Sequence, residues 1–170
     1  MIDQATWDRG AAVLRQGMST SVHCSIASIN EDGSPHVTPM GSLQITGLGT
    51  GMYFDVFNET LACNVDRDPR VTILAVNSSR SFWLTMLARG RFRDYPGVRF
   101  VGTIAPRRES TAREQARFRQ RVKRLRRLKG YRALWSEVGY ARDAEFTDVT
   151  FVRIGSTTSH LGDRVAKSQG

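Results

Sequence analysis

The sequence contains few of the residues that mark secreted or membrane-spanning proteins. Cys24 and Cys63 are its only cysteines; they lie in apolar segments with no metal-type spacing, which favours buried thiols over a disulfide. No apolar run approaches the roughly 18 residues that a membrane-spanning helix needs. The N-terminus shows no charged-then-apolar signal pattern. These absences favour a cytoplasmic globular protein that makes no membrane contact.

The short motifs of well-known catalytic sites are also missing. The sequence has no G-x-S-x-G nucleophile elbow, no P-loop and no dinucleotide fingerprint after a strand. The glycine-rich residues 47–51 lie between two expected strands, so they are interpreted as a turn. His23, His36 and His160 are the only histidines. No metal site is therefore expected, and no catalytic residue is assigned.

Acidic residues are scarce in one segment, and this segment accounts for the net charge of +9. Residues 107–132 contain twelve Arg or Lys and two Glu, whereas the rest of the chain has 13 basic and 14 acidic residues. Thr111 and Glu114 form a capping box, and Gly130 ends a predicted helix over residues 110–129. A solvated helix face is the favoured interpretation, with a rim that attracts anionic ligands as an alternative. Nucleic-acid binding is unlikely because interleaved aromatics and a second recognition helix are missing.

The segment from residue 22 to residue 76 predicts most of a small sheet. Val22, Cys24 and Ile26 alternate with polar or small residues, as in a strand with one buried face. Glycine-bearing turns separate this strand from expected strands at 35–45 and 52–57, which predicts an antiparallel meander. A short helix follows Asn58 and stops before Pro69, and another strand covers residues 71–76.

Other periodic segments flank this region. Residues 3–16 predict an amphipathic helix that ends at Gly17, and residues 131–140 predict a further turn of helix. Residues 98–103 and 146–154 predict strands. Residues 82–88 alternate with apolar side chains on both faces, which predicts a strand buried between the barrel and a second copy of the chain.

Three segments carry a resemblance to a known family. ASINEDGSPHVTPMG, GMYFDVFNETLACNVDRDPRVTILAV and LARGRF resemble, in this order, the pyridoxamine 5'-phosphate oxidase-like family of FMN-binding split β-barrels. The resemblance covers roughly residues 21–92. It implies an α+β, mainly β fold, an antiparallel split β-barrel with peripheral helices, and a homodimer. Residues 1–170 would form a single domain with a basic helical insertion at about 107–136.

The resemblance also implies a cofactor site. FMN would lie at the dimer interface, along strands corresponding to residues 35–41 and 52–57. Many relatives hold the phosphate with a Ser-Arg-Lys or Thr-Ser-Lys cluster at a helix start, whereas this chain has Glu59, Thr60 and Leu61 there. Another cation would then have to meet the phosphate. The implied cofactor-binding residues are His36, Thr38, Pro39, Met40, Asp55, Val56, Thr60, Asn64, Arg67 and Arg80.

Three functions remain open at this point. The resemblance favours an FMN-dependent oxidoreductase that acts on an unknown small-molecule substrate. A deazaflavin-dependent reductase is an alternative within the same family. A non-catalytic protein that binds haem or another anionic ligand is a third, with His160 as its best haem-ligand candidate.

Overall fold

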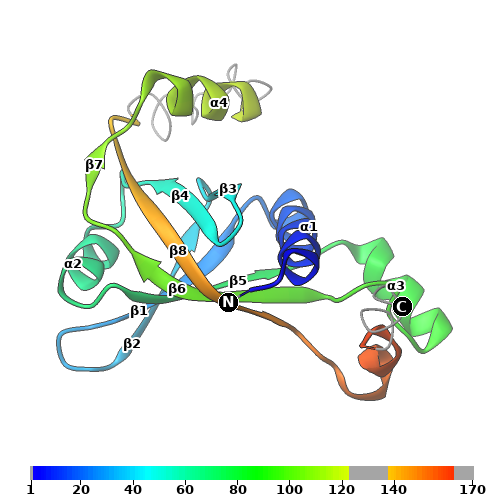
Figure 1. Cartoon of the computed structure of the whole chain (residues 1–170). Coiled ribbons are helices and arrows are strands. Elements are labelled where there is room, and N and C mark those ends of the chain that lie inside the picture. The colour runs from blue at the N-terminus through cyan, green and yellow to red at the C-terminus, as the bar shows by residue number, and fades with distance from the viewer. Residues whose placement is uncertain (1, 123–137, 163–170) are drawn as a thin grey trace.

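The computed structural model describes residues 2–122 and 138–162, and one antiparallel sheet forms its centre (Figure 1). The sheet has eight strands in the order β2-β1-β5-β6-β8-β4-β3, with β7 paired to β8. The expected α+β, mainly β fold class is thereby confirmed. The strands are β1 (Cys24–Ile29), β2 (Pro35–Met40), β3 (Gln44–Gly47), β4 (Thr50–Phe54), β5 (Arg70–Val76), β6 (Gly97–Ile104), β7 (Arg108–Glu109) and β8 (Tyr140–Phe151).

The first hairpin forms where the sequence predicts it. Side chains of β1 alternate between buried and partly exposed, and β1 pairs with β2 in a register that sets Ile26 opposite Thr38. Asp32 accepts hydrogen bonds from the Ser34 amide and hydroxyl, while Gly33 supplies a φ of 81°. Glycine adopts a positive φ without steric cost, so Gly33 next to the Asp32 turn lets the chain reverse.

The single strand expected over residues 35–45 is wrong. The chain leaves the sheet at Gly41 and re-enters as β3, and β2 and β3 occupy opposite ends of the strand order. The expected meander is therefore right for the pairs β1–β2 and β3–β4 but wrong as one continuous run of strands, because β4 pairs with β3 and β8 rather than with β2. Alternation within each piece was visible in the sequence, but a crossing between the ends of a sheet leaves no periodic signal.

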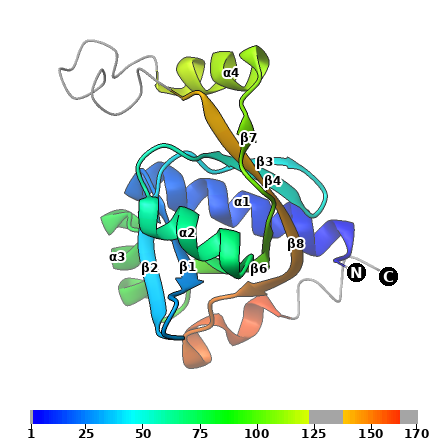
Figure 2. The same cartoon turned by 90° about the vertical axis from the view of Figure 1, so that its left-hand side faces the viewer.

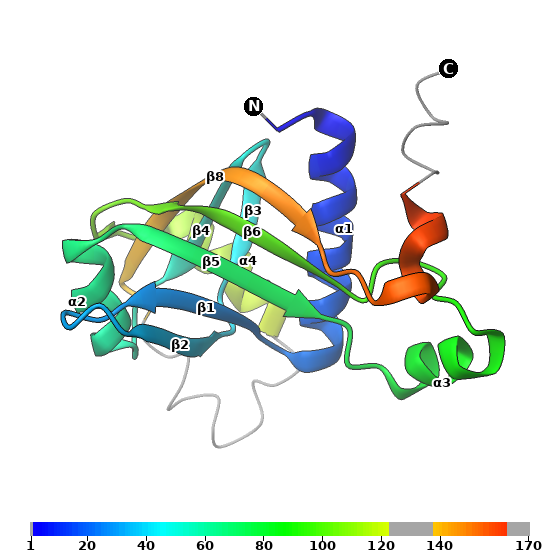
Figure 3. The ribbon, with the colours of Figure 1, turned by 90° about the horizontal axis from the view of Figure 1, so that it is seen from below.

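Helix α1 (Gln4–Ser21) crosses the end of the sheet and packs its apolar side on it (Figure 3). Trp7 packs edge-on against Phe100, and Leu14 is 2% exposed. The helix does not end at Gly17 as expected. Gly17 lies against the main chain of Ala75 and Val76, so it serves close packing, and Val22 ends the helix with a φ of 67°.

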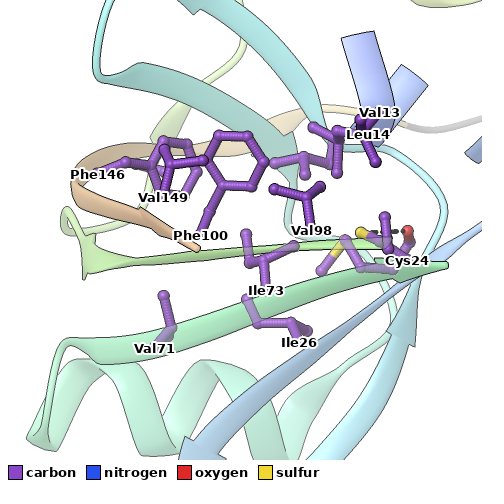
Figure 4. Packing of buried hydrophobic residues seen from close by; sticks show 14 of the residues in the cluster. Val13, Leu14, Cys24, Ile26, Val71, Ile73, Val98, Phe100, Phe146 and Val149 are labelled. Carbon is purple, nitrogen blue, oxygen red and sulfur yellow. Dashed lines mark hydrogen bonds between the residues drawn. The ribbon is translucent and has the colours of Figure 1, made fainter. Parts of the chain in front are cut away.

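The main core lies between α1 and the strands β1, β5, β6 and β8 (Figure 4). Ile26, Ile73, Val98 and Phe100 are fully buried there. Cys24 is also buried and its thiol donates to the Met40 carbonyl, whereas Cys63 is exposed. The expectation of two buried thiols is thus right for one and wrong for the other.

Residues 82–88 form a helix, α3 (Arg80–Arg89), rather than the expected strand. Gly90, with a φ of 65°, ends it in the left-handed conformation that glycine favours. Phe82 and Trp83 pack on Phe92, whereas Leu84 and Leu87 are 63% and 71% exposed. Apolar residues at both odd and even positions fit a helix with two apolar sides as well as a doubly buried strand.

The remaining helices are α2 (Glu59–Arg67), α4 (Ala112–Val122) and the 3₁₀-helix η2 (Gly155–Leu161). The capping box of α4 is confirmed, because Thr111 and Glu114 exchange hydrogen bonds with each other's amides. The rest of that expected helix and residues 131–137 lie outside the described residues, while Tyr140 begins a strand instead of ending a helix. No helix in the described part of the chain is long and apolar enough to cross a bilayer.

Candidate functional site

A groove runs along β2 to the start of α2, which lies across β1 and β2 in Figure 2. One part is a cavity of about 310 Å³ lined by His36, Thr38, Thr60 and their neighbours. The other is a cavity of about 170 Å³ lined by Pro39, Met40, Val56 and others. Phe57 and Asn58 line both parts. The structure therefore brings together six of the predicted site residues: His36, Thr38, Pro39, Met40, Val56 and Thr60.

The start of α2 presents main-chain donors to this groove. Asn58 occupies the N-cap position, but its side chain makes no capping hydrogen bond and instead accepts from the Thr38 hydroxyl at 3.3 Å. The first-turn amides of the helix therefore have no side-chain cap. Uncapped amides and the helix dipole together favour an anion at this end. The exposed Glu59 carboxylate lies in the same turn and opposes that preference.

Two predicted site residues use their side chains for hydrogen bonds within the protein. Asp55 is 6% exposed and accepts from the Arg142 guanidinium at 2.7 Å, with Arg107 3.6 Å away. Asn64 is buried, and its amide donates to the Ser28 hydroxyl and to the Asn30 side-chain oxygen. Neither residue lines the groove, and their hydrogen bonds hold α2 and the end of β4 in place.

Arg67 and Arg80 do not line the groove. Arg67 lies in the last turn of α2 and donates to the Ile29 carbonyl at 2.6 Å. Arg80 begins α3, which projects from the end of the sheet opposite α2 (Figure 1). Within the part of the chain that the structure describes, no Arg or Lys lines either part of the groove.

The other two histidines lie away from the groove. His160 lies in η2, where its Nε2 atom is 2.9 Å from the Phe92 carbonyl oxygen. His23 is exposed and precedes β1, so it is not the mid-strand histidine that the sequence pattern indicates. Over residues 2–122 and 138–162, His, Cys, Asp and Glu side chains nowhere gather in threes as a metal ion would require.

Several residues of the groove wall are outside the predicted site set, and Phe57, Asn58 and Phe118 are three of them. Phe57 is 60% exposed, which is unusual for a phenylalanine and is a signal visible only in the structure. Asn58 was expected only as a helix cap. Phe118 comes from α4 and packs on Phe54 with ring centroids 5.0 Å apart. Its distance in sequence from β2 hides this contact.

Solved structures of other proteins share this fold. An FMN-binding protein from Syntrophomonas wolfei subsp. wolfei matches with a TM-score of 0.62 at 8% identity, covering 89% of each chain. HupZ of Group A Streptococcus matches with a TM-score of 0.55 at 16% identity, covering 92% of this chain and 98% of its own. An F420 reductase matches with a TM-score of 0.55 at 12% identity, covering 82% and 94%. At these identities the likeness shows the fold alone.

Sequence comparison identifies the family. A search of curated proteins finds no match. The family model described as pyridoxamine 5'-phosphate oxidase matches residues 12–155, which include all the strands and the whole groove. The chain therefore belongs to the pyridoxamine 5'-phosphate oxidase-like family of split β-barrels.

Proposed function

We propose that this protein binds FMN in the groove between β2 and α2 and acts as a flavin-dependent oxidoreductase. The observation that supports this proposal best is a groove with an apolar wall at one end and the uncapped start of a helix at the other. The chain that carries this groove is a member of the family. A bound flavin would supply the hydride chemistry. The protein's own residues would bind and orient it and exclude water.

The groove fits the ring of a flavin better than its phosphate. Pro39, Met40 and Val56 offer an apolar surface for the ring system. At the other end, the α2 amides and the Thr60 hydroxyl offer donors to a phosphate. Glu59 repels a dianion there, and no cation from the described residues lines that end to offset it.

We further propose that the protein is a homodimer in which α3 packs on a second copy. Leu84 and Leu87 form an exposed apolar strip on this helix, which a second copy would remove from water. Arg80 begins the same helix. A dimer would carry Arg80 to the partner, where it could supply the cation that a flavin phosphate needs.

The visible spectrum of the purified protein and two titrations test the proposal. Stoichiometric flavin bands, or saturable binding of FMN to the colourless protein, are expected. Riboflavin has the same ring but no phosphate, so comparing the two separates the two ends of the groove. Failure of the protein to bind FMN, riboflavin and a deazaflavin would contradict the proposal, and binding of the deazaflavin alone would favour the family's other cofactor.

Replacing Glu59 sharpens this test. Glu59→Gln removes a negative charge from the first turn of α2, an effect of roughly 0.3–1 kcal/mol in such a position. We therefore expect FMN to bind about two- to fivefold more tightly, while the affinity for riboflavin stays constant. Glu31→Gln, an exposed change at the β1–β2 turn, is the matched control and should alter neither. An equal effect of Glu59→Gln on both flavins would place the phosphate elsewhere.

A further inference from the structure

A second and larger cleft lies between α1, α4 and the connection from β2 to β3. Its volume is about 540 Å³, which falls within the range of small-molecule sites. Most of its wall is apolar, and Leu14, Leu43 and Phe118 are each 2% exposed. The apolar side chains of the described residues that line it are Leu14, Met18, Val22, Leu43, Ile45, Phe118 and Val122.

Among residues 2–122 and 138–162, the charged groups that line this cleft are all of one sign. They are Arg15 and Arg121, and no Asp or Glu of these ranges joins them. Arg121 donates to the carbonyls of Gly41 and Leu43 at 2.6 and 3.0 Å, which fixes the guanidinium at the cleft. Neither arginine forms an ion pair with a carboxylate among residues 2–122 and 138–162.

The contrast with Arg108 shows what Arg121 lacks. Two carboxylates raise the pKa of Arg108, whereas desolvation lowers the pKa of Arg121, which has no carboxylate from the described residues beside it. Arg121 keeps its charge at neutral pH, because a guanidinium is not deprotonated in proteins. A partly desolvated cation beside an apolar wall is stabilised by an anion.

A third donor in the wall has no acceptor. Gln44 lines the cleft, and its Nε2 atom is buried without a hydrogen-bond partner. Gln44 Nε2 and the Tyr53 hydroxyl are the two buried side-chain polar atoms left unpaired in the described residues. A buried donor without an acceptor destabilises the fold, and an acceptor on a ligand that reaches it would remove this cost.

We propose that this cleft binds a carboxylate with an extended apolar body. The apolar wall would hold the hydrocarbon, and Arg121 and Gln44 would donate to the carboxylate, with Arg15 adding to the positive potential. The site is separate from the flavin groove, although Gly41 and Phe118 contribute to the walls of both. The proposal does not depend on flavin binding.

Calorimetric titration with monomeric dodecanoate tests the proposal, and dodecanol serves as the uncharged probe of equal length. We expect one dodecanoate to bind per chain, with dodecanol about tenfold weaker or more, because a charged hydrogen bond contributes about 1.5–3 kcal/mol. Absence of dodecanoate binding, or equal affinity for the two probes, would overturn the proposal.

Variants locate the bound acid. Arg121→Gln should weaken dodecanoate binding about tenfold and leave dodecanol binding unchanged, whereas Arg119→Gln, on the same helix but outside the cleft, should change neither. Gln44→Leu provides a second test that does not disturb the Arg121 contacts to Gly41 and Leu43. It should also weaken binding of the acid alone, without lowering the melting temperature.

A variant in the flavin groove separates the two sites. Phe57→Ala removes an exposed ring that lines only the flavin groove, so dodecanoate affinity should not change. A loss of affinity in Phe57→Ala as large as that in Arg121→Gln would show that the acid occupies the flavin groove, and the proposal would be wrong.

Discussion

Arg142 is the most deeply buried charged residue that the structure describes, with 1% of its surface exposed. Its guanidinium lies 2.7 Å from Asp55, directly after β4, and 2.5 Å from Asp66 on α2. These hydrogen bonds raise its pKa and lower the pKa of Asp66. One side chain of β8 therefore fixes both elements that border the groove along β2.

Removing this cation leaves the Asp55 carboxylate buried and only distantly paired with Arg107. We expect Arg142→Met to lower the free energy of unfolding by about 3 kcal/mol, the usual scale for breaking a buried ion pair. Asp66→Asn is the control, since the Asp66 side chain is 58% exposed and exposed pairs contribute less than about 1 kcal/mol. Urea denaturation compares them, and similar losses in the two variants would contradict the assigned role of Arg142.

At the scale of elements, Arg108 on β7 joins α4 to the sheet. It donates to both carboxylate oxygens of Glu114 on α4 and to both of Asp143 on β8. The hydrogen bonds that Glu114 accepts from Arg108 and from the Thr111 amide lower the pKa of Glu114 from 4.5 to about 2. Helix α4 supplies Phe118 and Arg121, so this junction positions the walls of both clefts.

Because of this junction, we expect the free energy of unfolding to depend on pH. A carboxylate whose pKa is lower in the folded state stabilises fully above its unfolded pKa of 4.5, and the stabilisation is lost as the pH falls towards about 2. We expect Glu114→Gln to remove a contribution on the order of 2 kcal/mol at pH 7 and less at pH 3. Glu109→Gln, at an exposed position on β7, is the control. Equal losses at both pH values for Glu114→Gln would refute the linkage.

An element could be predicted from the sequence when its pattern lies within a few neighbouring residues. Strands β1 and β5 alternate within six or seven residues, so local periodicity predicts them. Helix α3 was not predicted, because its apolar residues occur at both odd and even positions and so also fit a strand that is buried on both faces. In the groove, β2 and the α2 start were predictable from the resemblance. The hydrogen bond between Asp55 and Arg142 could not be predicted, because the two residues lie 87 positions apart in the sequence.

At the scale of the whole molecule, α3 projects from the sheet (Figure 1). Its apolar strip, Leu84 and Leu87, is exposed. Leu84→Glu combined with Leu87→Glu places two charges on this strip. In sedimentation experiments we expect the unaltered protein to be a dimer and the variant to be a monomer. Because the groove then lacks any partner cation, FMN affinity should also fall about tenfold, the scale of one charge-assisted hydrogen bond.

The control for this change is Leu48→Glu at the exposed turn between β3 and β4. It adds a charge at another exposed leucine and should leave both the mass and the FMN affinity unchanged. A charged strip that still sediments as a dimer would show that the copies associate through another surface.

The position of β2 at one end of the strand order limits how the protein can associate with itself. Pro35 and Pro39 lie four residues apart on β2, so they face the same side of that strand, and neither has an amide hydrogen to offer. An incoming strand would find two gaps in the row of donors, which blunts edge-to-edge pairing. This border of the sheet therefore resists the strand addition that leads to aggregation, even while the chain is concentrated during synthesis.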